Sequence, residues 1–171
     1  FASDDEALCN AVDCGFPPDF FEFYGPRVTA GAAAAHVNHP ADLWKVDWRQ
    51  IDDTITTSVE VWNTGGAGDH AATLENALWA LRAGDRLGLI GVPDGPAVGQ
   101  EPILLGTGLT GCDVPSLRRE DLLAALRARR CYATSGERIE LSLAVDGAPM
   151  GAEVEAPLGG TLPAIVEARA T

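Results

Sequence analysis

The stretch SVEVWNTGGAGDHAATLENALWALRAGDRLGLIGV, residues 58–92, decides the fold class. It opens with the alternating β-branched residues of a strand, continues through a glycine-rich loop, and ends in a short apolar run at residues 86–92. Between them Leu74, Leu78 and Leu81 recur at helical spacing, on the same side as Ala71 and Ala77. A strand–helix–strand order with a buried second strand predicts an α/β fold with a parallel sheet.

The regions on either side complete this prediction. A second helix is expected between Ser116, as its cap, and Arg130, and residues 139–145 alternate as a half-buried strand does. Asp146-Gly147 then indicates a C-terminal β-hairpin. We therefore divide the chain into an irregular N-terminal segment at 1–35, an α/β domain at 36–155, and the start of a further strand at 156–171 that we expect to be truncated.

Charge and cysteine content narrow the function classes. The chain has 171 residues and a formal net charge of -13, which predicts no nucleic-acid partner and no binding to an anionic membrane. No apolar run is long enough to cross a bilayer. The four cysteines form no CxxC pair, so we expect reduced thiols and a cytoplasmic protein, with a Cys9–Cys14 disulfide as the alternative.

Few residues suggest chemistry. His36 and His39 are three apart and could share a metal, although loop histidines without a ligand are the commoner arrangement. Asp94 follows the apolar strand at the end where α/β sheets place ligands, although Pro-Asp-Gly is also ordinary turn chemistry. His70 opens a helix where an anion could bind. Glu60 could enter a cleft or face solvent.

Several segments resemble the polymerase-and-histidinol-phosphatase (PHP) domain, in the branch related to carbamate and amide hydrolases. The resemblance covers about residues 36–155 and rests on motifs that occur in the family's order. These are His39-Pro40, Asp47-Trp48, VEVWN at 59–63, RLGLIG at 86–91, LLAALRARRCYATSG at 122–136 and DGAPMG at 146–151. The YATSG and DGAPMG stretches are the most specific of them.

The resemblance implies a fold, a cofactor and a site. The fold would be a partial or divergent form of the family's distorted β/α barrel, and the cofactor would be divalent metal ions (Zn, Mn or Fe) that activate water. Residue by residue, His39 and Asp94 carry over as metal ligands, with His36 as a nearby addition. The family's His-x-His and Thr-Asp-His motifs do not occur here, and Pro96 stands where the family has a histidine.

Two functions follow as expectations. The first is a metal-dependent hydrolase that cleaves a phosphoester, carbamate or amide bond in a small-molecule substrate, with His70 and Ser135 as candidate substrate-binding residues and no catalytic residue assigned. The second is a non-catalytic PHP-like binding or structural module. An unclosed barrel exposes a sheet edge, so we also expect self-association or a missing N-terminal segment. Met150 is expected to be structural.

Overall fold

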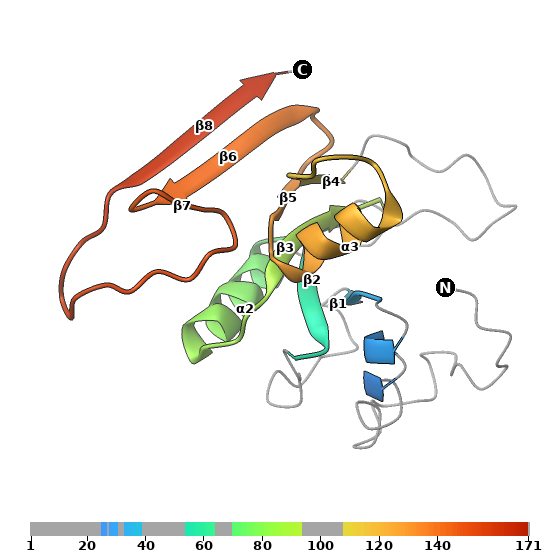
Figure 1. Ribbon diagram of the computed structural model, residues 1–171, viewed down its shortest axis with the longest axis horizontal. Helices are drawn as coiled ribbons and strands as arrows, with labels where there is room; N and C mark the ends of the chain where they lie inside the picture. The colour runs from blue at the N-terminus through green and yellow to red at the C-terminus, as the bar shows by residue number, and fades with distance from the viewer. Residues whose placement is uncertain are drawn as a thin grey trace, which may run out of the picture.

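A three-stranded parallel sheet forms the first layer of the fold. The computed structural model describes residues 25–26, 28–30, 33–38, 54–63, 70–93 and 108–170 (Figure 1). Strands β1 (Ala35–Val37), β2 (Thr56–Asn63) and β3 (Gly88–Val92) lie in the order β1-β2-β3, and both pairs are parallel. Helix α2 (His70–Ala83) connects β2 to β3. The predicted strand–helix–strand unit and the α/β class are thus confirmed, and the sheet is open within the described residues.

One face of this sheet packs on α2. Val59 and Val61 of β2 are buried against Ala77 and Ala80 of α2, and Val59 and both alanines are completely inaccessible. The predicted leucine stripe is wrong in one respect, since Leu74 is 42% exposed. Small side chains face the sheet instead, because they let the helix backbone approach the valine surface closely.

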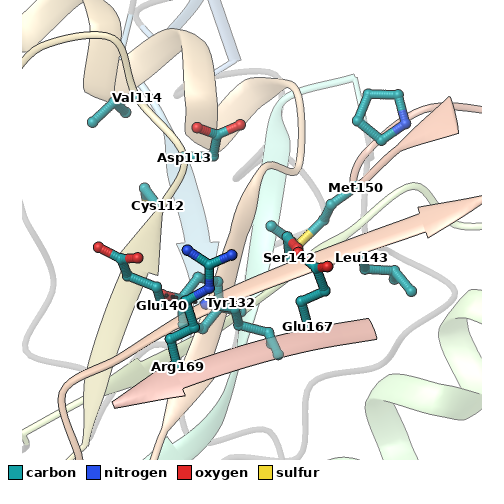
Figure 2. A pocket seen from close by; sticks show the side chains of 12 residues that line it. Cys112, Asp113, Val114, Tyr132, Glu140, Ser142, Leu143, Met150, Glu167 and Arg169 are labelled. Atoms are coloured by element: carbon teal, nitrogen blue, oxygen red, sulfur yellow. Dashed lines mark hydrogen bonds between the residues drawn. The ribbon is translucent and has the colours of Figure 1, made fainter. Parts of the chain in front are cut away.

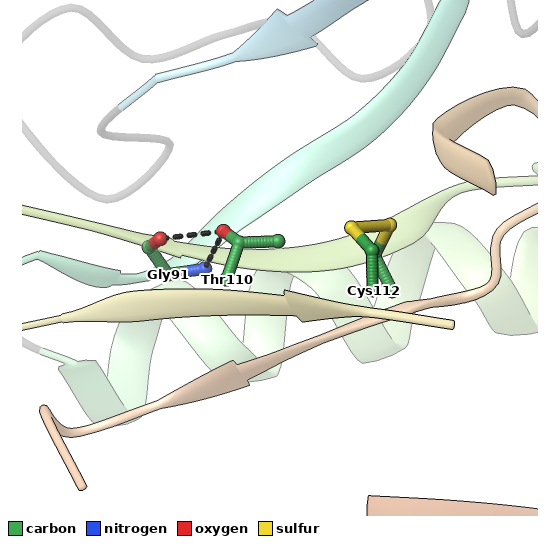
Figure 3. Close-up of a disulfide and its surroundings, with 4 residues drawn as sticks. Gly91, Thr110 and Cys112 are labelled. Carbon is green, nitrogen blue, oxygen red and sulfur yellow. Dashed lines mark hydrogen bonds between the residues drawn. A yellow bond between two sulfur atoms is a disulfide. The ribbon is translucent and has the colours of Figure 1, made fainter. Parts of the chain in front are cut away.

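A second pair of strands lies beside β3. Strands β4 (Leu109–Cys112) and β5 (Cys131–Thr134) are antiparallel, and helix α3 (Arg119–Arg127) connects them. The Thr110 hydroxyl donates to the Gly91 carbonyl oxygen at 2.6 Å and accepts from the Gly91 N–H at 3.2 Å (Figure 3). A Cβ on Gly91 would lie 2.8 Å from the Leu109 carbonyl oxygen. Glycine is therefore required for this close approach between β3 and β4.

The cysteines differ from the prediction. Cys112 and Cys131 form a disulfide, and Figure 3 shows it next to the Gly91–Thr110 contact. The two residues are direct cross-strand partners in the β4–β5 register, which brings together residues 19 apart in sequence. We expected reduced thiols, and for this pair that was wrong. Cys9 and Cys14 lie outside the described residues.

The N-cap of helix α3 lies two residues after the expected one, Ser116. Its N-cap is Arg118, which makes no side-chain capping bond. The Ser116 hydroxyl accepts from the Arg118 N–H at 3.3 Å and donates to the Asp121 carboxylate in the first turn. Ser116 therefore stabilises the start of the helix through Asp121. No helix among the described residues is long and apolar enough to span a membrane.

The C-terminal region forms a small antiparallel sheet. Its strands are β6 (Ile139–Val145), β7 (Ala148–Pro149) and β8 (Ala164–Ala170), in the order β7-β6-β8. Asp146 and Gly147 form the turn between β6 and β7 with φ of 50° and 79°, as a type I′ hairpin requires. The predicted hairpin is confirmed. The segment from residue 164 is a full strand, and it pairs along the whole of β6.

Two contacts fix the small sheet to the rest of the chain. The Tyr132 hydroxyl donates to the Ile139 carbonyl oxygen at 2.6 Å and accepts from the Leu141 N–H at 3.2 Å. Gly151, just after β7, lies against the end of α3, where a Cβ would be 1.9 Å from the Ala128 carbonyl oxygen. The first contact holds β6 against β5, and the second holds the loop after β7 against the end of α3. The placement of the small sheet therefore depends on Tyr132 and Gly151.

Candidate functional site

The strands of the parallel sheet do not all end at the same level. β2 and β3 end together, since Asn63 pairs with Val92, and ligand sites of open α/β sheets lie beyond such carboxyl ends. β1 ends earlier, where Val37 pairs with Val59. His36 is the next-to-last residue of β1. His39 and Asp94 come shortly after β1 and β3 in sequence, but both lie outside the described residues. The structure thus places His36 beside Ser58, level with Gly88 at the start of β3 and away from the carboxyl end at Val92.

The sheet face opposite α2 carries polar side chains. His36 pairs with Ser58 in the β1–β2 register, and Glu60 follows two residues along β2 and therefore on the same face. Ser58 is 2% exposed and Glu60 is 1% exposed. A carboxylate this deeply buried is costly unless nearby groups stabilise its charge. The face that α2 does not cover is thus the polar side of this sheet.

His36 and Glu60 interact electrostatically. Desolvation by surrounding protein atoms lowers the pKa of the His36 imidazole, and the negative charge of Glu60 opposes part of that shift. His36 as a residue remains exposed, whereas Glu60 is enclosed. A largely neutral imidazole at the surface, beside a buried carboxylate, is the form that binds a divalent metal.

Ser135 lies near the carboxyl end of β3. It follows Thr134, the last residue of β5, whose carbonyl oxygen is 3.2 Å from the Cβ position of Gly91. The exposed Ser135 hydroxyl donates to the Glu137 carboxylate, and this bond is the main cause of the lowered pKa of Glu137. Ser135 therefore sits close to the end of β3 with its hydroxyl already engaged in a local turn.

The remaining candidates are only partly placed. His70 is the first residue of α2, the helix that follows the carboxyl end of β2, and its side chain is not described. Across the described ranges, no three side chains of His, Cys, Asp or Glu are grouped closely enough to hold a metal ion. The two ligands that the PHP resemblance assigns, His39 and Asp94, are outside those ranges.

A cavity of about 470 Å³ lies elsewhere, between β4–β5 and the small sheet. Figure 2 shows Glu140, Arg169 and Tyr132 at one end of it and Glu167, Ser142 and Met150 at the other. Asp113 and the disulfide-bonded Cys112 complete its polar side. None of its lining residues belongs to the parallel sheet, so this cavity is separate from the sheet face that carries His36.

A third region collects arginines at the end of the parallel sheet where its strands begin. Arg86, Arg127 and Arg129 line a cavity of about 350 Å³ near the start of β2. Arg86 and Arg129 lie 3.1 Å and 3.6 Å from the Glu153 carboxylate, and Arg127 donates to the Ala33 carbonyl oxygen. These guanidinium groups bind the chain to itself, so they hold the fold near the starts of β1, β2 and β3.

Sequence reasoning left Glu60 undecided between a cleft and the solvent. The structure decides for burial, since the face of β2 that bears Glu60 is as inaccessible as the valine face. The sequence carried no signal that decides this point: Thr56 and Ser58 on the same face are small and polar, and such side chains are compatible with an enclosed face as well as with an exposed one. Alternation alone separates the two faces of a strand without telling which is covered.

Comparison with known proteins gives short matches to long relatives. The chain is 46% identical over 61 residues to an uncharacterized protein of Chlamydia pneumoniae, covering 36% of this chain and 9% of that protein. It is 47% identical over 47 residues to an uncharacterized protein of Chlamydia muridarum, or 28% of this chain and 8% of that one. The chain thus spans less than a tenth of these relatives' length. No family model and no solved structure matches.

Proposed function

We propose that the chain forms part of a PHP-type metal-dependent hydrolase, in which metal-activated water cleaves a phosphoester, carbamate or amide bond of a small molecule. The parallel sheet, covered by α2 on one face, would be a section of the family's distorted β/α barrel. One observation carries the proposal: Glu60, 1% exposed, lies beside His36 on the polar face of the sheet that α2 does not cover. An enclosed carboxylate next to an accessible imidazole is typical of metal and hydrolytic sites.

The donor set suits a divalent ion. His36, with His39 and Asp94 from the resemblance, would hold the metal through imidazole nitrogen and carboxylate oxygen, the ligands that Zn, Mn and Fe accept. When bound, the metal would supply a water of lowered pKa and polarise the scissile group. Glu60 would keep the imidazole of His36 oriented and its ring nitrogen basic toward the ion. Ser135 and His70 would contact the substrate from the ends of β5 and α2.

Metal titration tests this proposal. Calorimetry with Zn and Mn should show binding that weakens about tenfold or more in Glu60→Gln, since carboxylates behind a metal-bound histidine contribute on this scale. His36→Ala should weaken binding as well. Glu75→Gln removes an exposed carboxylate from α2 and serves as the matched control. Unchanged affinity in both site variants would exclude this face as the metal site.

A second candidate function is a non-catalytic PHP-like binding or structural module. It is favoured by Pro96, which stands where the family has a metal-ligating histidine. Elemental analysis of the purified chain separates the two: stoichiometric Zn, Mn or Fe supports the hydrolase, and none after loading supports the module. The cytoplasmic location stays a prediction, tested by fractionation.

A further inference from the structure

The outer edge of β8 is an open strand edge. β8 pairs only with β6 in the described sheet and forms the border of the order β7-β6-β8. All seven of its residues are exposed, and Figure 1 shows the strand on the side of β6 turned away from α2 and α3. Ile165 and Val166 are 65% and 64% exposed. Unpaired edges with exposed apolar side chains pair with further strands.

The backbone groups that face outward can be assigned. The Asp146 N–H donates to the Pro163 carbonyl oxygen, so hydrogen-bonded pairs between β6 and β8 recur at every second residue from there. Ile165, Glu167 and Arg169 therefore turn their N–H and C=O groups toward β6. On the other side of β6, Ile139 and Leu141 direct theirs toward Tyr132, as this alternation requires.

It follows that Ala164, Val166, Ala168 and Ala170 present their N–H and C=O groups at the free edge. An added antiparallel strand must form its hydrogen-bonded pairs with these residues. The side chains of the residues between them then lie in the non-hydrogen-bonded pairs, where cross-strand side chains are closest. Those intervening residues include both charges of the strand, Glu167 and Arg169.

We propose that this edge pairs with β8 of a second copy of the chain, antiparallel and centred on Ala168. In that register Ala168 pairs with Ala168 of the second copy, and Val166 pairs with Ala170. Glu167 then lies directly opposite Arg169 on both sides of the two-fold axis. Opposite charges in non-hydrogen-bonded pairs stabilise strand pairing, and this strand supplies them symmetrically.

Neighbouring registers lack this match. A register centred on Glu167 places the two Glu167 carboxylates against each other, and one centred on Val166 places Ile165 against Glu167. All three registers pair outward-facing residues with one another. The register centred on Glu167 also engages Ala164, but it sets two like charges in contact, whereas the register centred on Ala168 forms two opposite-charge pairs. The self-complementarity of the Glu167–Arg169 spacing is therefore the reason to assign a second copy rather than an unrelated strand.

Pairing also extends the apolar face of the small sheet. Val166 is opposite Leu143 in the β6–β8 register, and Ala168 and Ala170 lie on the same face. Joining two copies makes this face continuous across the two-fold axis, and Leu143 at 36% exposure belongs to it. The expected assembly is a two-fold dimer with one sheet running through both copies.

Complementary charge reversal tests the register. Glu167→Arg and Arg169→Glu each place like charges opposite one another at both symmetric positions, and each alone should raise the dimer dissociation constant about tenfold or more. Mixed in equal amounts, the two variants restore both opposite-charge pairs, so the mixture should associate nearly as well as the wild-type chain. Glu155→Arg makes the same charge change at an exposed position outside β8 and controls for net charge.

Ala168→Pro tests the edge itself. It removes an outward N–H that β6 does not use, so it should abolish association while the β6–β8 pairing persists. Analytical ultracentrifugation over a range of concentrations measures association, and circular dichroism checks folding. A wild-type chain that stays monomeric would overturn the proposal. Single charge-reversal variants that dimerise as tightly as the wild-type chain would also overturn it, and so would a mixture that associates no more tightly than either variant alone. These two results can be obtained even if the proline variant does not fold.

Discussion

Substituting Gly91 by alanine should destabilise the fold through steric contact alone. The new Cβ would lie 2.8 Å from the Leu109 carbonyl oxygen and 3.2 Å from that of Thr134. Both neighbours are backbone atoms, so β4 and β5 must move away from β3 and weaken the Thr110 bridge. Forcing an extra carbon into a packed contact costs about 1–3 kcal/mol. This loss should lower the urea concentration at the midpoint of unfolding by on the order of 1 M.

The matched control is Gly88→Ala, three residues earlier in β3. There a Cβ would meet its nearest neighbour, the Thr57 carbonyl oxygen, at 3.4 Å, an ordinary van der Waals distance. This variant should be neutral, or more stable by up to about 1 kcal/mol, because alanine restricts the unfolded chain. Tryptophan fluorescence during urea unfolding measures both. Equal stability of the two variants would refute the assigned closeness of β3 to β4 and β5.

Four further outcomes are expected. Replacing Cys112 and Cys131 by serine should lower the free energy of unfolding by about 3 kcal/mol, because a disulfide between residues 19 apart removes that much loop-closure entropy from the unfolded chain. Chemical reduction of the wild-type disulfide should lower the melting temperature by the same amount as the serine substitutions. Burial lowers the pKa of His36 in the folded state from its usual 6.5. The neutral imidazole therefore contributes its full stability above the unfolded-state pKa, and the free energy of unfolding falls as the pH drops below that value. His36→Gln should flatten that decline in urea midpoints measured between about pH 8 and pH 5. Tyr132→Phe should cost about 1 kcal/mol and speed amide exchange in β6, whereas faster exchange elsewhere only would contradict its role. Met150→Leu should cost less than ~1.5 kcal/mol in the same unfolding assay, as volume-conserving substitutions do.

Local sequence patterns predicted the positions of strands and helices better than they predicted which side chains pack together. The alternation at 58–62 and the apolar run at 86–92 correspond to β2 and β3, and Gly84 ends α2 with φ of 107°. Helical spacing correctly placed Ala77 on the buried face of α2, but it also placed Leu74 and Ala71 there, and both are exposed. It missed Ala80, because hydrophobicity favours the larger leucines.

The candidate site depended on pairing between distant strands. His36 could be singled out as a histidine, but its nearness to Glu60 arises from the β1–β2 register, which joins residues more than 20 apart. The Cys112–Cys131 pair has the same origin in the β4–β5 register. Such registers are set by turn geometry and by which faces are buried, and a single sequence specifies neither directly.

The contact of Gly151 with the end of α3 bears on how freely the sequence can vary. Any side chain at this position would overlap the Ala128 carbonyl oxygen, and φ of 88° already disfavours every residue except glycine. A saturation library selected for folding should therefore return glycine alone at this codon. Part of the distinctive DGAPMG stretch would then persist through sequence drift because of packing, whatever chemistry the protein performs.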